Sequence, residues 1–189
     1  MEGNVFVSVT PKPIRRVVTG TDDQGRSCVL YDSAAPSVNR HVSAAMTDLW
    51  VYPRTPAPIG GERDDGRNPF NFEPPHDGGH LRIVHSQGRP ADYDPARDER
   101  RKERHATERA ENGTLYRGGQ NAYSSPYHKS QTMDYGLLLE GLRTLILDDG
   151  VYPMQPGDVV VQLGNWHGWT NVDSGSLMAF LMMGARVKE

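Results

Sequence analysis

The part of the chain from residue 114 onward constrains the fold most, because short apolar runs alternate there with tight-turn sequences. Residues 148–150 read Asp-Asp-Gly and residues 155–158 read Gln-Pro-Gly-Asp, and both sequences favour hairpin turns. Residues 177–183 are seven consecutive apolar residues, a run too short to cross a bilayer and suited to a strand buried on both faces. This pattern predicts an all-β domain, either a β-sandwich or a jelly-roll barrel.

Two histidines and one carboxylate flank the first strands of this part. In a strand, residues of equal parity face the same side, so His128, Ser130, Thr132 and Asp134 are expected to point the same way. The return hairpin is expected to bring His167 opposite them. The two imidazoles and the carboxylate would then converge inside the barrel.

The two histidine segments resemble the two motifs of the cupin superfamily. The first motif reads His-x-His-x3-Glu and the second Pro-x-Gly-x2-His-x3-Asn. The residues at these motif positions are His128, Ser130, Asp134, Gln162, Gly164, His167 and Asn171. Asp134 is a shortened homologue of the motif glutamate, and Ser130 and Gln162 depart from the motif. The resemblance covers residues 115–187 and, loosely, the rest of the chain.

The resemblance implies a single cupin domain over residues 1–189, all-β, with a cupin-type double-stranded β-helix or jelly-roll barrel, an irregular N-terminal half and a short charged helical insertion. Residues 1–52 would form N-terminal strands and an arm. Residues 53–113 would hold a Pro/Gly-rich loop, a strand and the insertion, and residues 114–187 the core motifs. The residues themselves predict strands at 14–19, 27–31, 46–52 and 80–85, with a hairpin turn at 21–25 and an irregular surface loop at 53–79.

The charged insertion is expected to be a helix over residues 94–113. Asp94 would be its N-cap and Pro95 its first residue, and Asn112 with Gly113 would end it. Three alanines are its only apolar residues, so it has no stripe to bury. A solvated helix is therefore expected, and a lid over the barrel mouth is the alternative.

The cupin resemblance implies a divalent metal ion (Zn, Fe or Mn) held by His128, Asp134 and His167. Two histidines and one carboxylate form the ligand set of a facial triad, and three protein ligands plus water also suit catalytic zinc. Ser130 stands where the family has a further histidine ligand. The same three residues are the candidate catalytic residues with or without the metal, and no organic cofactor is expected.

The substrate pocket is expected to include Ser130, Thr132, Trp169 and Asn171. Trp169 shares the parity of His167 and would line the cavity, whereas Trp166 would point away and Tyr135 would pack outside. The remaining histidines show no ligand spacing and are expected in solvent or loops; they are His41, His76, His80, His85 and His105.

The resemblance implies an enzyme of small-molecule metabolism, with a small carboxylic acid or carbonyl compound as substrate. A lyase or isomerase is favoured, which would catalyse decarboxylation, dehydration or proton transfer next to a carbonyl. One alternative is an Fe(II)-dependent dioxygenase that uses the same facial triad. Another is a non-catalytic small-molecule-binding cupin.

Composition bears on partners and location. The formal net charge of −3 gives no reason to expect a nucleic-acid partner. No apolar run approaches the roughly 18 residues of a membrane span, and the first residues lack the pattern of a signal peptide. The single cysteine, Cys28, fits a reducing cytoplasm. A homodimer is expected, in which an arm at residues 5–18 adds a strand to a neighbouring copy.

Overall fold

The structure, a computed structural model, describes residues 9–60 and 62–186. Twelve strands and one short 3-10 helix follow one another along this part of the chain. They are β1 (Arg15–Thr21), β2 (Ser27–Ala34), β3 (Ser37–Arg40), β4 (Ala44–Tyr52), β5 (Gly79–Ser86), η1 (Pro95–Arg97), β6 (Arg104–Arg109), β7 (Leu115–Gly118), β8 (His128–Lys129), β9 (Thr132–Ile146), β10 (Val151–Met154), β11 (Val159–Gln162) and β12 (Gly168–Gly184).

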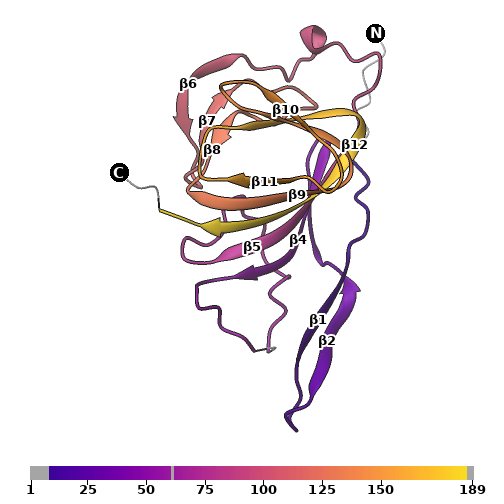
Figure 1. Cartoon of the computed structure of the whole chain (residues 1–189), viewed down its shortest axis with the longest axis vertical. Coiled ribbons are helices and arrows are strands. Elements are labelled where there is room, and N and C mark those ends of the chain that lie inside the picture. The colour runs from indigo at the N-terminus through magenta and orange to yellow at the C-terminus, as the bar shows by residue number, and fades with distance from the viewer. Residues whose placement is uncertain (1–8, 61, 187–189) are drawn as a thin grey trace.

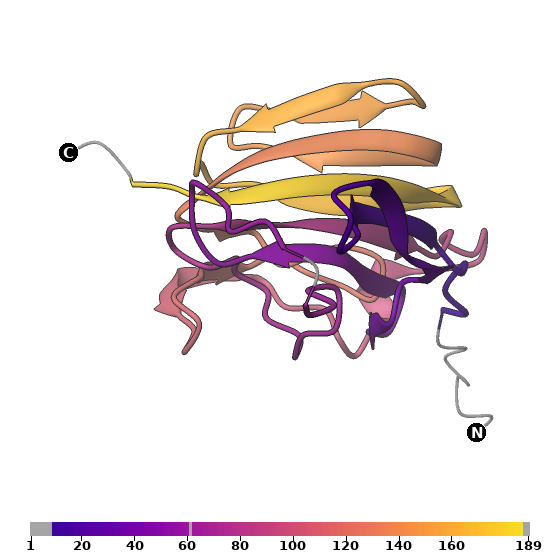
Figure 2. The same ribbon diagram turned by 90° about the horizontal axis from the view of Figure 1, so that it is seen from below.

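The largest sheet has the strand order β10-β9-β12-β5-β4-β3, with β11 also paired to β9. All its pairings are antiparallel. A second sheet, β6-β7-β8, and the β1–β2 hairpin complete the fold. Figure 1 shows β9 to β12 curling at one end and the hairpin projecting from the other, and Figure 2 shows β12 in the middle of the large sheet. The expected all-β jelly-roll fold is confirmed.

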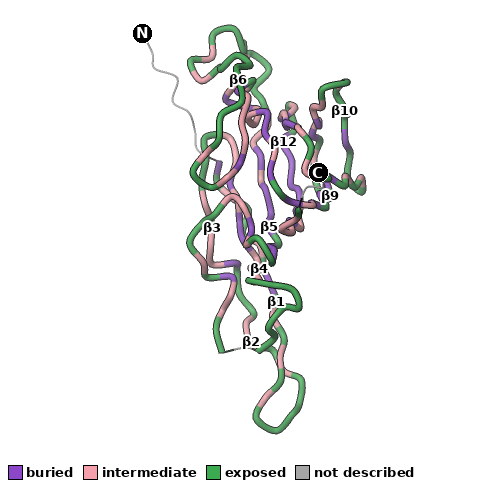
Figure 3. Tube along the Cα trace, turned by 90° about the vertical axis from the view of Figure 1, so that its left-hand side faces the viewer, coloured by how far each residue is buried: buried purple, intermediate pink, exposed green. Residues whose placement is uncertain are grey.

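The apolar core lies on the inner face of the large sheet, where Figure 3 shows the buried stretches of β5, β9 and β12. Its buried members are Val84, Leu138, Leu145, Met154, Trp169, Met178, Phe180 and Met182. Alternate residues of each strand contribute to this face because side chains alternate across a strand. The core therefore forms between strands that are distant in the sequence. The buried polar residues of the candidate site lie on the same inner face.

A bulge in β9 changes which residues face the core. Leu138 is buried on one side of the bulge, and Arg143 and Leu145 are buried on the other, so the inward parity changes from even to odd. Gly141 lies between them with φ of 73°. A Cβ at Gly141 would approach the carbonyl oxygen of Gly175 to 2.1 Å, so both the backbone conformation and the close contact require glycine.

The helix expected over residues 94–113 is wrong. Asp94 does cap a helix, since its carboxylate accepts from the Ala96 amide at 2.9 Å, but that helix is the single 3-10 turn η1. The chain then forms strand β6, which pairs with β7, and Gly113 lies in the connecting turn with φ of 95°. Without an apolar stripe, tertiary burial does not stabilise a helix here, and pairing with β7 supplies the backbone hydrogen bonds instead.

The N-terminal expectations are largely confirmed. The three expected strands are β1, β2 and β4, and the expected strand at 80–85 is β5. The loop expected at 53–79 has no extended strand among its described residues before Gly79, where β5 begins. One expectation was wrong: His80 is 2% exposed and lies in the core instead of solvent or a loop. Its burial, together with the charge of Arg82, lowers its pKa to about 3. The described residues include no helix that could span a membrane.

The arm expected to mediate dimerisation lies partly outside the described residues, because its residues 5–8 are not described. The described part contacts its own chain. Val9 is buried, the Lys12 amide donates to His85 Nδ1 at 3.1 Å, and Lys12 Nζ pairs with Glu140 at 2.5 Å. The homodimer therefore stays a prediction.

An exposed apolar face on β9 and β11 allows a direct test of dimerisation. Leu137 lies opposite Val159 and Tyr135 opposite Val161, and all four side chains are exposed. We expect a second copy to cover this face, because sheet faces of this kind are usually buried. Val161→Lys should convert the dimer to a monomer in sedimentation velocity at tens of micromolar. Val29→Lys on the projecting hairpin, with a similar exposure (56% against 51%), should not. A monomeric wild-type chain at that concentration would contradict the prediction.

Candidate functional site

His128 and His167 face each other across two neighbouring backbone segments. The two residues exchange both backbone hydrogen bonds, at 2.8 and 2.9 Å, which places their side chains on the same side. The ring centroids lie 4.3 Å apart with an angle of 57° between the planes. Both side chains are buried. The predicted convergence of the two histidines is confirmed.

The hydrogen bonds of the two rings fix their tautomers. His128 Nδ1 lies 2.8 Å from the carbonyl oxygen of Pro126, and His167 Nδ1 lies 3.0 Å from that of Asn165. A carbonyl oxygen only accepts, so Nδ1 donates in both cases and Nε2 carries the lone pair of the neutral ring. Burial lowers the pKa of His128. Burial, together with the repulsion that two protonated rings would feel, lowers the pKa of His167 to about 3. Both imidazoles are therefore neutral at pH 7.

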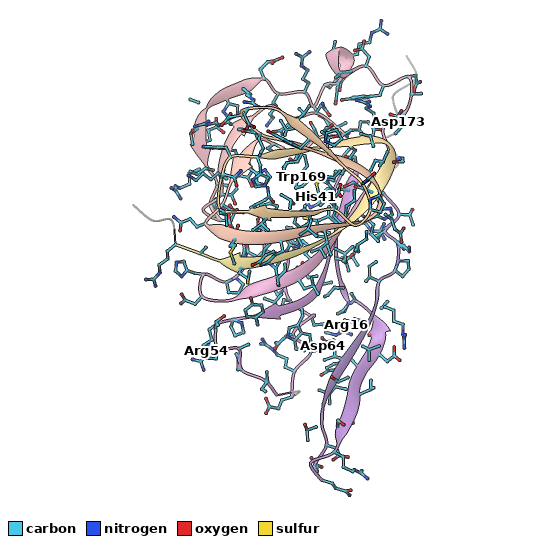
Figure 4. All side chains as sticks on the ribbon, in the orientation of Figure 1. Arg16, His41, Arg54, Asp64, Trp169 and Asp173 are labelled. Atoms are coloured by element: carbon cyan, nitrogen blue, oxygen red, sulfur yellow. The ribbon has the colours of Figure 1, made fainter. Side chains whose placement is uncertain are left out.

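Aromatic side chains from three parts of the chain surround the histidine pair. Phe72 and Tyr116 lie 5.6 and 6.2 Å from the His128 ring, and Trp169 lies 6.4 Å from the His167 ring. Figure 4 shows Trp169 within the curled end of the sheet, as the sequence predicts. Trp166 instead stacks on Tyr127 outside this site, at 5.9 Å. The histidines thus sit in an environment that excludes water and strengthens electrostatic interactions.

Asp134 is buried on the inner face together with Ser130 and Thr132, as their shared parity predicts. Burial raises the pKa of Asp134 to about 7, the Thr132 hydroxyl opposes this shift, and the charge of Glu73 adds to it. Asp134 Oδ1 has no hydrogen-bond partner among the described residues. The Ser130 and Thr132 hydroxyls are 2.7 Å apart. Asp134 is therefore a carboxyl group that titrates near neutral pH.

The described residues do not form the three-ligand metal centre implied by the family resemblance. Within this part of the chain, no three His, Cys, Asp or Glu side chains come together in a group that could hold a metal ion. His128 and His167 could offer two Nε2 donors, but Asp134 does not join them as a third ligand. The donor set of this conformation therefore does not fit a facial triad or a three-ligand zinc site.

Arg143 is an inward-facing residue that the sequence analysis missed. It pairs with Asn171 across β9 and β12, so both side chains lie on the inner face, where both are buried. Its Nη1 donates to Ser86 Oγ at 2.6 Å, and its guanidinium carbon lies 5.3 Å from the centre of the Trp169 ring. The isolated Gly141 within a strand pattern is the signal that could have revealed the bulge and hence the inward position.

The loop at 53–79 also contributes to the site, although the sequence pattern placed it at the surface. Phe72 packs against His128, and Glu73 hydrogen-bonds to the Thr114 hydroxyl. Burial raises the pKa of Glu73. No periodicity marks these two residues, because an irregular segment has no fixed alternation of faces. No signal in the sequence could have found them.

A pocket of about 330 Å³ lies elsewhere on the molecule. Lys12, His85, Glu140 and Gly175 are among its lining residues, and none of the predicted site residues lines it. Its floor is the bulged region of β9 and β12, and its lining includes the exposed Lys12–Glu140 ion pair. The pocket is therefore separate from the histidine pair, although its lining includes Ser86, the hydrogen-bond partner of Arg143.

Comparisons with known proteins find short local similarities to cupin-domain-containing proteins. No protein-family model matches the chain. The cupin-domain-containing oxidoreductase srdD of Neurospora crassa is 49% identical over 49 residues, which cover 25% of this chain and 25% of that protein. The cupin-domain-containing oxidoreductase fogC of Aspergillus ruber is 37% identical over 60 residues, which cover 31% of this chain and 30% of that protein. The matches therefore span less than a third of either relative.

Among solved structures, KdgF from Halomonas sp. is similar at a TM-score of 0.45 and 10% identity, over 80% of this chain and 90% of that chain. This likeness is too distant to support a conclusion. The two motif segments, the antiparallel fold that brings their histidines together and the local matches to cupin-domain-containing proteins agree with one another. The chain is therefore similar to cupin-domain-containing proteins in its motifs and over short stretches of sequence.

Proposed function

We propose that the chain is a small-molecule enzyme, a lyase or isomerase that moves a proton next to a carbonyl group. The observation that carries the proposal is the pair of buried, neutral imidazoles whose Nδ1 atoms are fixed by backbone carbonyls. Each ring then keeps an Nε2 lone pair that can accept a proton from a bound molecule. An imidazole in this state is a general base that needs no change of tautomer before it acts.

The roles follow from the protonation states. Nε2 of His128 or His167 would accept the proton from the carbon next to the carbonyl. The pKa of about 3 makes free His167 a weak base at pH 7, but an anionic substrate beside the pair would raise the histidine pKa values. Asp134, with its pKa near 7, would deliver or accept the second proton on the same inner face. Return of the proton to another atom completes an isomerisation, and departure of a neighbouring hydroxyl group as water, with a proton from Asp134, completes a dehydration. In a decarboxylation CO₂ would leave first, and the protonated Asp134 would then donate a proton to the carbon that lost it.

An oxidoreductase is the second candidate, because the curated relatives named above carry that name. An Fe(II)-dependent dioxygenase would need a metal site that the described residues do not assemble in this conformation. The geometry therefore favours acid–base chemistry, and the names of the relatives favour redox chemistry. The two proposals differ in a property that is simple to measure.

Solvent exchange separates the two candidates. The wild-type chain, purified without added metal, should catalyse the exchange of carbon-bound hydrogen for deuterium in a panel of small keto and hydroxy acids, followed by proton NMR. We expect exchange without oxygen consumption and without stoichiometric metal in elemental analysis. Stoichiometric iron, together with oxygen uptake that depends on an added panel compound, would replace the lyase or isomerase proposal by the dioxygenase. Binding of a panel compound without exchange or oxygen uptake would support the non-catalytic alternative.

A further inference from the structure

Arg143 is a buried cation that has no acidic partner in the described part of the chain. Its side chain is 7% exposed, and its hydrogen bond to Ser86 Oγ engages one of the five N–H donors of a guanidinium. Its Nε is buried without a hydrogen-bond partner. Burial lowers its pKa to about 10, so the group is still protonated at pH 7. A buried charge without a counter-charge is unfavourable unless something neutralises it.

The two other buried arginines show how this protein neutralises a structural guanidinium. Arg82 donates to both carboxylate oxygens of Asp48, at 2.6 and 3.1 Å, and to the carbonyl oxygens of Asn71 and Phe72. Arg16 donates to both carboxylate oxygens of Asp64, a pair that Figure 4 shows near the base of the β1–β2 hairpin. Among the described residues, Arg143 has neither a carboxylate nor a carbonyl partner. Its position is therefore not explained by the ion pairing that stabilises the others.

We propose that Arg143 binds the carboxylate group of a small carboxylic acid in the interior of the barrel. The planar fork of a guanidinium matches the two oxygens of a carboxylate, which would satisfy donors that the protein leaves free. Asn171, opposite Arg143 in the β9–β12 register, lies beside the same position and could add an amide hydrogen bond. Ser86 holds the guanidinium in place.

Trp169 connects this position to the histidine pair. The guanidinium carbon of Arg143 lies 5.3 Å from the Trp169 ring centre, and the His167 ring lies 6.4 Å from it on a T-shaped approach. A carboxylic acid held at Arg143 would place its carbon chain along Trp169 and its next carbons toward His167. This part of the inference rests on the proposed function, and it supplies the negative charge that the proposed mechanism needs near the imidazoles.

Titration calorimetry with benzoate and with benzamide, its neutral counterpart, tests the anion site without measuring activity. Wild-type protein should bind benzoate and not benzamide. Arg143→Met should weaken benzoate binding about 100-fold, because charge-assisted hydrogen bonds are lost, and Arg143→Lys should weaken it about tenfold. Arg117→Met is the matched control, since the Arg117 guanidinium also lies over a tryptophan, Trp166, at 3.9 Å, but outside the site. It should bind benzoate like the wild type.

A loss of benzoate binding in Arg143→Met can be distinguished from a loss of folding. Arg143→Met removes an unpaired buried charge, so its thermal unfolding should show a folded protein at least as stable as the wild type. Equal benzoate affinity in Arg143→Met and wild type would overturn the inference, as would no benzoate binding at all. Tighter binding of inorganic phosphate than of benzoate at Arg143 would overturn the carboxylate assignment. His167→Gln should still bind benzoate, so failure of the proposed reaction and failure of the anion site are distinguishable.

Discussion

His167→Gln is expected to lower kcat by about 10²- to 10⁴-fold on whichever compound undergoes exchange, because that range is typical for loss of a general acid or base. The glutamine amide retains hydrogen-bonding capacity near the Asn165 carbonyl, which His167 Nδ1 now contacts at 3.0 Å. The glutamine amide cannot accept a proton as Nε2 of His167 does. KM should change little, since the substrate carboxylate is held at Arg143. Steady-state and single-turnover kinetics measure both effects.

His105→Gln is the control for this variant. His105 Nδ1 also contacts a backbone carbonyl, that of Ala106 at 2.6 Å, but the residue lies on β6 and away from the histidine pair. Its kcat should equal that of the wild type. If His167→Gln kept a kcat within threefold of wild type while remaining folded, His167 would not be the base, and the same outcome in His128→Gln would exclude the pair.

The sequence predicted those parts of the protein in which the alternation of side chains along a strand, or the spacing of a motif, determines where a side chain lies. The segments at 127–136 and 164–171 follow family spacing and strand parity, and both suffice to predict that His128 and His167 meet. The burial of Trp169 and the exposure of Tyr135 follow from the same alternation. These predictions depend only on neighbours within a strand and on one hairpin return.

The remaining features depend on a bulge, an irregular loop and contacts between distant segments, which the alternation of side chains along a strand does not predict. The bulge at Gly141 reverses the inward parity of β9, so Arg143 becomes an interior residue although the even-numbered pattern upstream places it outside. Phe72 and Glu73 reach the site from an irregular loop. The charged segment at 94–113 carries capping residues for a helix, yet it forms β6 because a neighbouring strand provides hydrogen-bond partners and no apolar stripe favours the helix. Metal ligation depends on how three side chains are placed in space, which motif spacing alone does not determine.

Asp134→Asn is expected to make the protein more stable at pH 8 and less active. Burial raises the folded-state pKa of Asp134 from 3.8 to about 7, so the folded protein holds this proton more tightly than the unfolded chain does. Below pH 3.8 the carboxyl group is protonated in both the folded and the unfolded protein, so it does not make the free energy of unfolding depend on pH. Between pH 3.8 and about 7 the free energy of unfolding falls by about 1.4 kcal/mol per pH unit, and above pH 7 the full deficit of about 4 kcal/mol remains.

Asparagine stays neutral at every pH, so the gain in unfolding free energy over wild type should be near zero at pH 4 and approach about 4 kcal/mol at pH 8. The buried neutral histidines lower the free energy of unfolding as pH falls below 6.5. This loss is equal in the wild type and in Asp134→Asn, so it cancels in the difference between the two proteins. Asp64→Asn is the control with the opposite sign, because the hydrogen bonds from Arg16 lower the pKa of Asp64 and its loss should destabilise the protein at pH 8. Urea unfolding at pH 4, 6 and 8 measures both variants. A difference for Asp134→Asn that does not change with pH would show that folding does not raise the pKa of Asp134, and it would remove Asp134 from the proposed proton transfer.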